Sequence, residues 1–199
     1  MAFRTEMAMQ RLLVIGAGGH GCSVAEAVLL GGVYQLTAFL DDGAGRPHSV
    51  WDVPVWGTTA ELAACRGRVD AVVVAIGRND LRQDLHTRVR AAGLALATVV
   101  HPSAVVSPRA VLGDGCTLMA GAIVGTQAQL GEGVIVNCGA VVDHDCRVEA
   151  FGHLGVKAGM AGGSVLGAGA WMQAGSSLGY GVTVPAGVVL RPGESLSSP

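Results

Sequence analysis

In the segment Val136-Asn-Cys-Gly-Ala-Val-Val-Asp-His-Asp-Cys-Arg-Val-Glu-Ala-Phe-Gly-His-Leu154, an aliphatic side chain returns at every sixth position. The same spacing continues without a break in both directions, and every member is aliphatic or Met: Val100, Val106, Leu112, Leu118, Val124, Leu130, Val136, Val142, Val148, Leu154, Met160, Leu166, Met172, Leu178, Val184, Leu190 and Leu196. Four positions after each member, from Ala104 to Val188, the residue is small or β-branched. Neither an α-helix nor a β-strand has a period of six. Hexapeptide periodicity of this length is typical of a parallel β-helix.

Each hexad therefore forms one short strand and one turn, with the aliphatic residue directed inward and the small residue fitted to the corner. Three hexads complete one coil, so residues 100–199 make about five and a half coils. Glycine often follows the aliphatic residue, and there we expect the backbone to bend with a demanding φ: Gly113, Gly125, Gly131, Gly155, Gly167 and Gly179. The residue before the aliphatic should point outward, and it is often apolar: Val111, Ile123, Ile135, Val141, Val165 and Trp171. Such a column predicts an oligomer.

Residues 11–98 follow a different pattern, in which apolar strands alternate with helices. The predicted strands cover 11–15, 36–40 and 71–76, and the predicted helices cover 23–30, the region near 58–65, and 80–92. Unbroken aliphatic strands separated by helices indicate a parallel sheet that is buried on both faces. The predicted fold is an α/β, Rossmann-like domain over residues 1–98, followed by an all-β parallel β-helix over residues 99–199.

Composition excludes several classes of protein. Half of the 199 residues are hydrophobic, which is too many for a long disordered chain, and no apolar run is long enough to cross a bilayer. The net charge of −2, with Lys157 as the one lysine, argues against nucleic-acid binding. Residues 1–10 contain no signal-peptide core, so we expect a cytoplasmic protein. The five cysteines lack metal-ligand spacing and are interpreted as reduced thiols: Cys22, Cys65, Cys116, Cys138 and Cys146.

The polar residues of the middle coils gather within one coil: Asn137, Asp143, His144, Asp145 and His153. His144 is the third residue of its hexad, which places it on an outward turn. A neighbouring carboxylate can hold the tautomer of an imidazole and raise its basicity, as a general base near neutral pH requires. Residues one coil apart stack, so His144 should lie beside Thr126 and Gly162, and the bare backbone of Gly162 should leave a trough for an extended ligand. An ordinary turn histidine capped by Asp143 or Asp145 fits the same residues.

The first predicted strand ends in the glycine-rich loop Gly16-Ala-Gly-Gly-His-Gly21. Its Gly-x-Gly-x-x-Gly spacing, with Asp41 some twenty residues further on, fits a dinucleotide-binding fingerprint. Main-chain amides at a helix N-terminus favour a phosphate-bearing ligand, whichever nucleotide carries it. Fewer than 100 residues are too few for a complete dinucleotide domain, which argues against a nicotinamide oxidoreductase.

Motifs spread over nearly the whole chain resemble, in the same order, hexapeptide-repeat sugar acyltransferases of the sialic-acid O-acetyltransferase and bacillosamine (nucleotide-amino-sugar) N-acetyltransferase family. These motifs are Gly16–Gly21, Phe39–Asp42, Ala75–Arg82, His101–Val106, and Asn137–Cys146 followed by His153. The resemblance implies a left-handed β-helix, acetyl-CoA as co-substrate, no metal, and a nucleotide-linked amino-sugar, preferably a 4-amino sugar, as acceptor. It also implies a homotrimer whose active sites lie between subunits.

The resemblance further implies roles for individual residues. His144 would be the general base that takes the proton from the attacking amine, Asp145 would enhance its basicity, and Asn137 would help to hold the reacting groups. The residues implied to bind the pantetheine arm of the cofactor are His153, Gly162 and Ala174. Gly18, Gly19 and His20 would hold the nucleotide-sugar, and Asp41 and Asp42 would contact its base or ribose. Gly77, Asn79 and Arg82 would complete that site.

Several alternatives stay open. Asn79 and Arg82 also fit residues that only cap and solubilise a helix, and Lys157 fits either a cofactor phosphate contact or a solvated turn. The chain ends at 191–199 without the family's usual further strand, which would shorten the cover near the cofactor's adenine end. A sugar O-acetyltransferase or a non-catalytic nucleotide-sugar scaffold would share the same fold. A zinc hydratase of the γ-carbonic-anhydrase type would need three converging imidazoles, which the spacing of His101, His144 and His153 does not favour.

Overall fold

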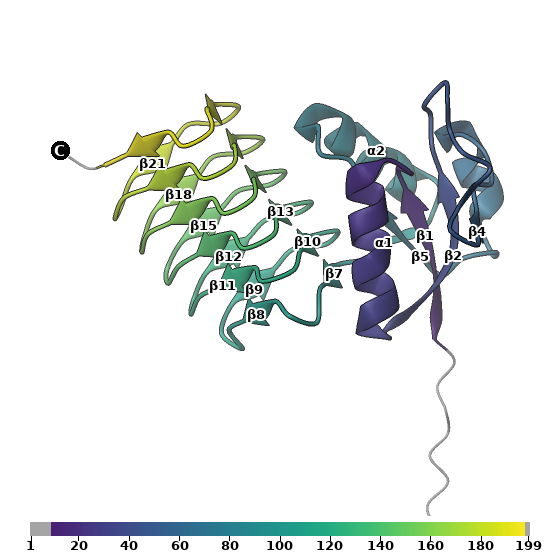
Figure 1. Cartoon of the computed structure of the whole chain (residues 1–199), viewed down its shortest axis with the longest axis horizontal. Coiled ribbons are helices and arrows are strands. Elements are labelled where there is room, and N and C mark those ends of the chain that lie inside the picture. Colours follow the sequence, from purple (N-terminus) through teal and green to yellow (C-terminus); the bar gives the residue numbers. More distant parts are fainter. Residues whose placement is uncertain (1–8, 198–199) are drawn as a thin grey trace, which may run out of the picture.

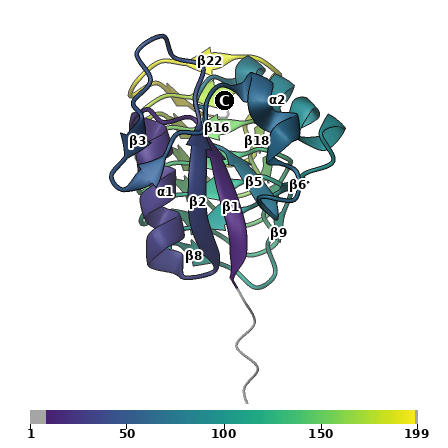
Figure 2. The same ribbon diagram turned by 90° about the vertical axis from the view of Figure 1, so that its right-hand side faces the viewer.

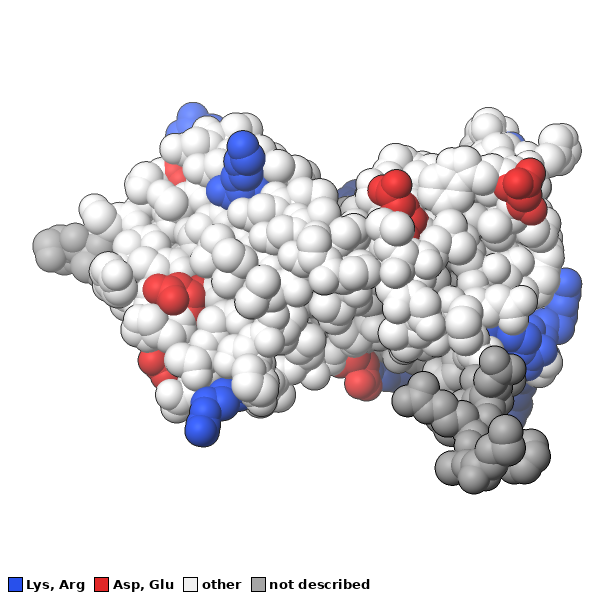
Figure 3. All heavy atoms as spheres, turned by 60° about the horizontal axis from the view of Figure 1, so that its bottom comes forward, with Lys and Arg blue, Asp and Glu red and all other residues white. Residues whose placement is uncertain are grey.

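The computed structural model describes residues 9–197 and shows an α/β domain followed by a parallel β-helix (Figure 1). The predicted absence of a signal-peptide core therefore falls mostly outside the described residues. Within these residues, none of the helices has the length and apolar character needed to cross a membrane. On the face shown in Figure 3, charged side chains are scattered and separated by uncharged surface, without a continuous basic strip.

The N-terminal domain contains a four-stranded parallel sheet with strand order β2-β1-β5-β6. Its elements are β1 (Gln10–Ile15), α1 (Gly19–Gly31), β2 (Tyr34–Leu40), β3 (Ser49–Val50), β4 (Val53–Pro54), η1 (Thr59–Cys65), β5 (Ala71–Val74), α2 (Asn79–Ala91) and β6 (Ala95–Leu96). The predicted alternation of strands and helices is confirmed, although the middle helix is a 3₁₀ helix and the third strand is shorter than expected. The short antiparallel hairpin of β3 and β4 was not predicted.

The topology of this sheet places a ligand site at the carboxyl end of β1. The chain passes from β1 to β2 on one side and then crosses to β5 on the other side, so β1 stands where the winding direction reverses. Open α/β sheets bind ligands at this position. The loops that follow β1 and β5 begin at Gly16 and Ala75, which brings the glycine-rich loop and the Gly77 segment together.

The β-helix consists of two-residue strands arranged in three parallel sheets. The first sheet contains β7 (Val99–Val100), β10 (Thr117–Leu118), β13 (Ile135–Val136), β16 (His153–Leu154), β19 (Trp171–Met172) and β22 (Val189–Leu190). The second contains β8 (Val105–Val106), β11 (Ile123–Val124), β14 (Val141–Val142), β17 (Gly159–Met160), β20 (Ser177–Leu178) and β23 (Ser195–Leu196). The third contains β9 (Val111–Leu112), β12 (Gln129–Leu130), β15 (Arg147–Val148), β18 (Val165–Leu166) and β21 (Thr183–Val184). We call the turns between the first and second sheets the first corner, those between the second and third the second corner, and those leading back to the first sheet the third corner.

The predicted inward series forms the core of the β-helix, where most of its members are buried together with the small corner residues. Val106, Leu112 and Leu196 are partly buried, and Val100 is 38% exposed because β7 ends its ladder. The prediction that the glycines after the aliphatic residues are needed for a demanding φ was wrong. Gly131 has no positive φ, but a Cβ there would lie 2.6 Å from the backbone nitrogen of Ala150 in the next coil. The left-handed turn residue lies two positions later, as at Gly133.

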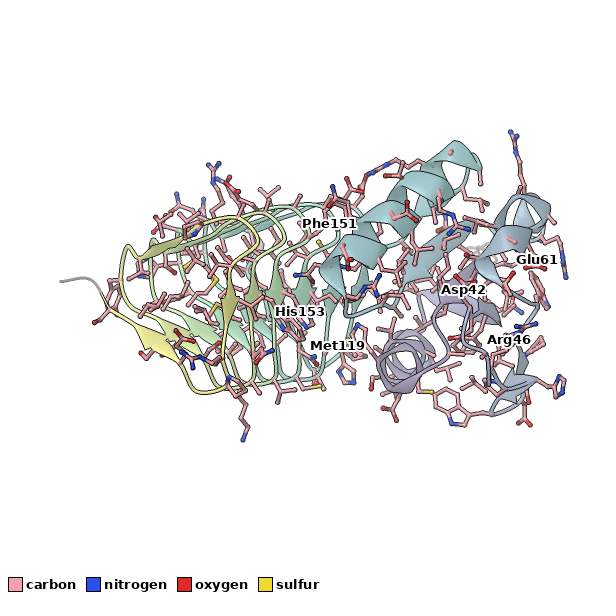
Figure 4. All side chains as sticks on the ribbon, turned by 90° about the horizontal axis from the view of Figure 1, so that it is seen from above. Asp42, Arg46, Glu61, Met119, Phe151 and His153 are labelled. Carbon is pink, nitrogen blue, oxygen red and sulfur yellow. The ribbon has the colours of Figure 1, made fainter. Side chains whose placement is uncertain are left out.

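Most of the outward side of the first sheet is covered by the N-terminal domain, although Val189 on β22 is exposed. Figure 2 looks along the long axis with β1, β2 and β5 in front of the coils, and Figure 4 shows Met119 and His153 on the side that faces the domain. Ile135 is therefore fully buried and Trp171 half-buried, which corrects the expectation that both lie on an open face. Val111 and Ile123, on the other two sheets, are exposed as predicted.

One face of α2 fastens the two domains together through side chains four residues apart. Arg82 is completely buried, and all of its N–H groups donate to oxygen atoms, among them the Gly133 carbonyl at 2.7 Å and the Phe151 carbonyl at 2.8 Å. His86 is also completely buried, and its Nδ1 lies 2.9 Å from the Glu132 carboxylate. Arg90, one turn further, pairs with Glu132 and with Asp114. All of these partners lie on the third corner of the β-helix.

Candidate active site

His144 lies on the second corner of the β-helix, where its side chain is about half exposed. Its Nδ1 is 2.8 Å from the Asp145 carboxylate, and its backbone N–H donates to the Asp143 carboxylate at 2.8 Å. Because a carboxylate only accepts, the neutral ring carries its proton on Nδ1 and leaves a lone pair on Nε2. The hydrogen bond to Asp145 and the nearby charge of Asp143 raise the pKa of His144. The imidazole is thus oriented and made more basic, as a general base requires.

The turn that supplies Asp145 has an unusual backbone conformation. Asp145 has a φ of +57°, in the left-handed region, at a position where most hexads of the β-helix have glycine. Aspartate tolerates this region better than most residues but is still less favourable there than glycine. A carboxylate retained at such a position, and bonded to the neighbouring imidazole, points to a functional constraint.

Gly162 stacks on His144 as the coil arithmetic predicts, but it does not leave an empty trough. A Cβ on Gly162 would lie 2.5 Å from both Cε1 and Nε2 of His144, so the imidazole itself occupies the space over the glycine. The backbone pairing Gly163 N–H to His144 carbonyl, at 3.0 Å, fixes this register. Glycine is required here because the ring leans over from its own coil onto the next one.

Asn137 and Ala174 lie on the first corner, separated from His144 by the width of the second sheet. The Asn137 side chain accepts a hydrogen bond from the Cys138 N–H at 2.8 Å. Ala174 stands next to Gly155, where a Cβ would come within 2.9 Å of the Ala174 nitrogen. Within one chain, the structure therefore does not bring Asn137 or Ala174 to the imidazole of His144.

His153 points outward from the first sheet into the contact with the N-terminal domain. Its Nδ1 is 3.1 Å from the Gly77 carbonyl, and its ring stacks on Trp171 with centroids 5.1 Å apart. Burial, with the charge of Arg82 nearby, lowers the pKa of His153 to about 3. Burial likewise lowers the pKa of His20 to about 4. These two imidazoles are therefore neutral at neutral pH, and the contact of His153 with Gly77 joins the N-terminal domain to the first sheet.

The glycine-rich loop presents free backbone at the start of α1. Gly18 and Gly19 are exposed, and a Cβ on either would meet nothing within 4 Å. Gly21 is required for packing, because a Cβ there would lie 1.9 Å from the Gly16 carbonyl oxygen. Gly18 forms the N-cap of α1 without a side-chain hydrogen bond. This geometry suits an anion that accepts from main-chain amides.

Asp41 and Asp42, the two acidic residues predicted to contact a ligand, both accept hydrogen bonds from other parts of the protein. Asp41 accepts from the Ala17 N–H at 2.7 Å and from the Gly43 N–H at 2.7 Å, so it braces the glycine-rich loop. Asp42 accepts from the Thr59 N–H at 2.7 Å and from the Thr59 hydroxyl at 2.8 Å, at the start of η1. Both residues nevertheless line a pocket of about 260 Å³ at the carboxyl ends of β1 and β2.

Gly77, Asn79 and Arg82 lie between the loop region and the β-helix. The Gly77 carbonyl accepts from Arg82 at 3.2 Å, and Asn79 donates to the Gly169 carbonyl at 2.8 Å while accepting from Arg82 at 2.9 Å. A guanidinium with every N–H engaged has none left for a ligand, so Arg82 serves here as a bracket between domains. This differs from both sequence interpretations, ligand contact and helix cap, because neither includes a second domain over α2.

The cysteines and the potential metal ligands were also compared with their sequence predictions. All five cysteines are free thiols, and burial raises the pKa of Cys116 to about 11. Among residues 9–197, no group of three His, Cys, Asp or Glu side chains is arranged to hold a metal ion. Sequence reasoning missed His86 on α2 and its neighbours Glu132 and Phe151 at the third corner; the four-residue spacing of Arg82, His86 and Arg90 on one helix face was the available signal.

A parallel β-helix that presents a carboxylate-supported histidine, joined to an α/β domain with an open glycine-rich loop, defines a hexapeptide-repeat acyltransferase with an N-terminal α/β domain. Comparison with known proteins agrees. Residues 11–89 match the family model of the PglD N-terminal domain. The chain is similar to the UDP-N-acetylbacillosamine N-acetyltransferase of Bacillus subtilis (strain 168), with 30% identity over 116 residues, covering 56% of this chain and 52% of that relative. The match thus spans about half of that curated relative.

Two solved structures match over nearly the full length. A histidine-to-alanine mutant of GDP-perosamine N-acetyl transferase from Caulobacter crescentus, in complex with CoA and GDP-perosamine, has 37% identity and a TM-score of 0.83, covering 94% of this chain and 91% of its own. The acetyltransferase domain of PglB from Neisseria gonorrhoeae FA1090, in complex with acetyl coenzyme A, has 38% identity and a TM-score of 0.74, covering 96% and 97%. The chain belongs to the bacillosamine-type family of nucleotide-amino-sugar N-acetyltransferases, and is an acyltransferase.

Proposed function

We propose that this protein is an acetyl-CoA-dependent N-acetyltransferase that acts on a nucleotide-linked amino-sugar, with a 4-amino sugar preferred. The observation that carries the proposal is the His144 imidazole, held by Asp145 at Nδ1 and half exposed at the second corner. The bacillosamine and perosamine enzymes named above, which act on nucleotide-linked sugars, support the substrate class.

In the proposed reaction, the sugar amine attacks the thioester carbonyl directly. The lone pair of the amine forms the new C–N bond while its proton passes to Nε2 of His144. The C–S bond then breaks, the electron pair leaves with sulfur, and the proton on Nε2 is available to the departing thiolate, which yields free CoA. The Asp145 carboxylate stabilises the imidazolium that forms in between.

The proposal also includes a homotrimer with sites between subunits, because one chain does not assemble the site alone. The open loop at Gly18 lies with Gly77 and His153 on the side of the first sheet, whereas His144 lies on the second corner. A nucleotide-sugar held at the loop of one subunit is therefore offered to the imidazole of a neighbour. We propose that Asn137 and Ala174 of one subunit lie opposite His144 and Gly162 of another in this homotrimer.

The test is a thiol-release assay with acetyl-CoA against a panel of UDP-, GDP- and dTDP-linked amino-sugars, with the matching hydroxyl sugars alongside. We expect release with an amino-sugar, and His144→Ala should lose most turnover while the protein still folds and binds CoA. His101→Ala, which removes a histidine on another corner, is the control and should stay active. Transfer to hydroxyl sugars alone would make the protein an O-acetyltransferase, and ligand binding without transfer would make it a scaffold.

A further inference from the structure

A buried threonine links α2 to one of the two acidic residues predicted to contact the nucleotide. Thr59, the first residue of η1, is only 4% exposed. Its backbone N–H and its hydroxyl donate to the two carboxylate oxygens of Asp42, at 2.7 Å and 2.8 Å. One guanidinium nitrogen of Arg88 donates to the Thr59 hydroxyl at 2.8 Å and to the Thr59 carbonyl at 3.0 Å. The three residues thus form one chain of hydrogen bonds that leads from α2 to Asp42.

The direction of this chain is fixed by the chemistry of its members. A guanidinium only donates hydrogen bonds, and an ionised carboxylate only accepts them. The Thr59 hydroxyl has a single proton, so the bond from Arg88 occupies an oxygen lone pair and the proton goes to Asp42. Without Arg88, the hydroxyl is free to rotate about its C–O bond. Arg88 therefore determines where the hydroxyl proton points, and with it one of the two bonds that orient the Asp42 carboxylate.

Asp42 keeps acceptor capacity for a ligand. A carboxylate has about four lone-pair sites, and Thr59 uses one on each oxygen, so each oxygen can accept again. The Asp42 side chain is exposed and lines the pocket of about 260 Å³ at the carboxyl ends of β1 and β2. A ligand group that meets this carboxylate must donate a hydrogen bond, as the ribose hydroxyls and the base N–H groups of a nucleotide do.

We infer that Arg88 is a positioning residue for the nucleotide, which acts through Thr59 to hold the Asp42 carboxylate in the orientation that accepts from the nucleoside. This inference rests on the proposed function. Arg88 is not among the residues that line the pocket, so its effect on a ligand there passes through Thr59. The helix that carries Arg88 is itself anchored, because Arg82 on the opposite face of α2 is bonded to the β-helix.

Binding of GDP, UDP and dTDP, measured by calorimetry on the whole chain without acetyl-CoA, tests the inference. For the diphosphate that wild type binds most tightly, Arg88→Met should raise Kd about tenfold, the effect of one misdirected hydrogen bond to a charged group. Arg88→Lys keeps a positive donor and should recover part of that affinity. In acetyl transfer, Arg88→Met should raise the KM for the nucleotide-sugar by the same factor and leave kcat and the KM for acetyl-CoA within about twofold of wild type.

A double-mutant cycle shows whether Arg88 acts through Thr59. Thr59→Val replaces the hydroxyl with a methyl group and should weaken binding about as much as Arg88→Met. In a Thr59→Val background, Arg88→Met should have no further effect, because the hydroxyl that it orients is gone. Arg11→Met is the matched control: Arg11 lies in the same domain, is as exposed as Arg88 (41% against 40%), and pairs with Asp70 at the opposite end of β1. This variant should bind as wild type.

Additive losses in the double variant would overturn the inference, because Arg88 would then act on the ligand or on the fold directly. Unchanged affinity in Arg88→Met, an equal loss in Arg11→Met, or no binding of these diphosphates by wild type would also overturn it. If Arg88→Met does not fold, Thr59→Val provides the test, and wild-type affinity in that variant contradicts the inference. Failure of the proposed function is separate: a protein that binds the diphosphate but acetylates no amino-sugar contradicts that function, while the binding cycle still decides the role of Arg88.

Discussion

Replacing Gly162 with alanine tests whether the position of the imidazole, and not merely its presence, supports turnover. The added Cβ would lie 2.5 Å from Cε1 and Nε2 of His144. Carbon atoms in contact settle at about 3.5 Å, so the ring must move by about 1 Å. The backbone itself accepts alanine, because Gly162 is not among the glycines with positive φ.

A displacement of that size has a predictable cost. Misplacing a catalytic group by about 1 Å lowers a rate by about 100-fold, or about 2.7 kcal/mol of transition-state stabilisation. We therefore expect Gly162→Ala to reduce kcat for acetyl transfer by about that factor. Stability should change little, because the His144 side chain is half exposed and can yield toward solvent.

The assay is steady-state thiol release at saturating acetyl-CoA, with urea unfolding measured in parallel. Gly159→Ala is the control: this glycine lies on the second sheet, has no positive φ, and a Cβ there meets nothing within 4 Å. A Gly162→Ala enzyme with kcat within twofold of wild type would refute the reasoning. A fall in kcat matched by Gly159→Ala would refute it as well, because the loss would then belong to glycine replacement in general.

Three further predictions concern protonation and the contact between domains. Asp145 raises the pKa of His144, and the base works only when it is deprotonated. Activity should therefore be lost as the pH falls through that raised pKa. Asp145→Asn should move this acidic limb of the kcat/KM profile to lower pH. Arg82→Met leaves buried carbonyl groups without donors and should lower the free energy of unfolding by about 3–5 kcal/mol in urea titrations. Arg82→Lys should recover only part of this loss, because an ammonium group cannot reproduce the planar set of N–H donors of the guanidinium. The pKa values of His20 and His153, about 4 and about 3, lie below that of an unfolded histidine, so the unfolded chain binds more protons below pH ~6.5. Stability should therefore decrease as pH falls from there toward 4, by about 1.4 kcal/mol per pH unit for each ring, and a flat profile in urea titrations would contradict the burial of both rings.

The β-helix could be predicted from the sequence because its rule is local and repeated. One aliphatic residue in six must fill the interior of the coil, and most members of the series are buried there, although Val100 at the end of its ladder is exposed. The pairing of residues one coil apart follows from the same count and correctly placed Gly162 beside His144. The six-residue periodicity does not show in which direction a side chain leans. It therefore predicted a trough at Gly162, where the His144 imidazole lies.

The contact between the domains could not be predicted in the same way. Arg82 and His86 read in sequence as ordinary polar residues of a helix, yet both are completely buried against the third corner. The partners of Arg82 on the β-helix, the Gly133 and Phe151 carbonyls, are backbone groups that carry no sequence signal. Asp42 shows the same limit, since nothing near it in sequence reveals that Thr59 takes up both of its oxygens.

The distribution of the three sheets supports the proposed oligomer. The chain's own N-terminal domain covers most of the first sheet, where Val189 on β22 stays exposed, whereas it does not cover the second and third sheets, which meet at the corner that carries His144. Exposed apolar side chains flank that corner on both sides: Val105 and Ile123 on the second sheet, and Val111 on the third. Burying them against a neighbour would also exclude water from the imidazole, and electrostatic interactions strengthen when water is removed. The surface that favours association is thus the surface that carries the proposed general base. We therefore expect that a substitution that disrupts the oligomer also abolishes acetyl transfer.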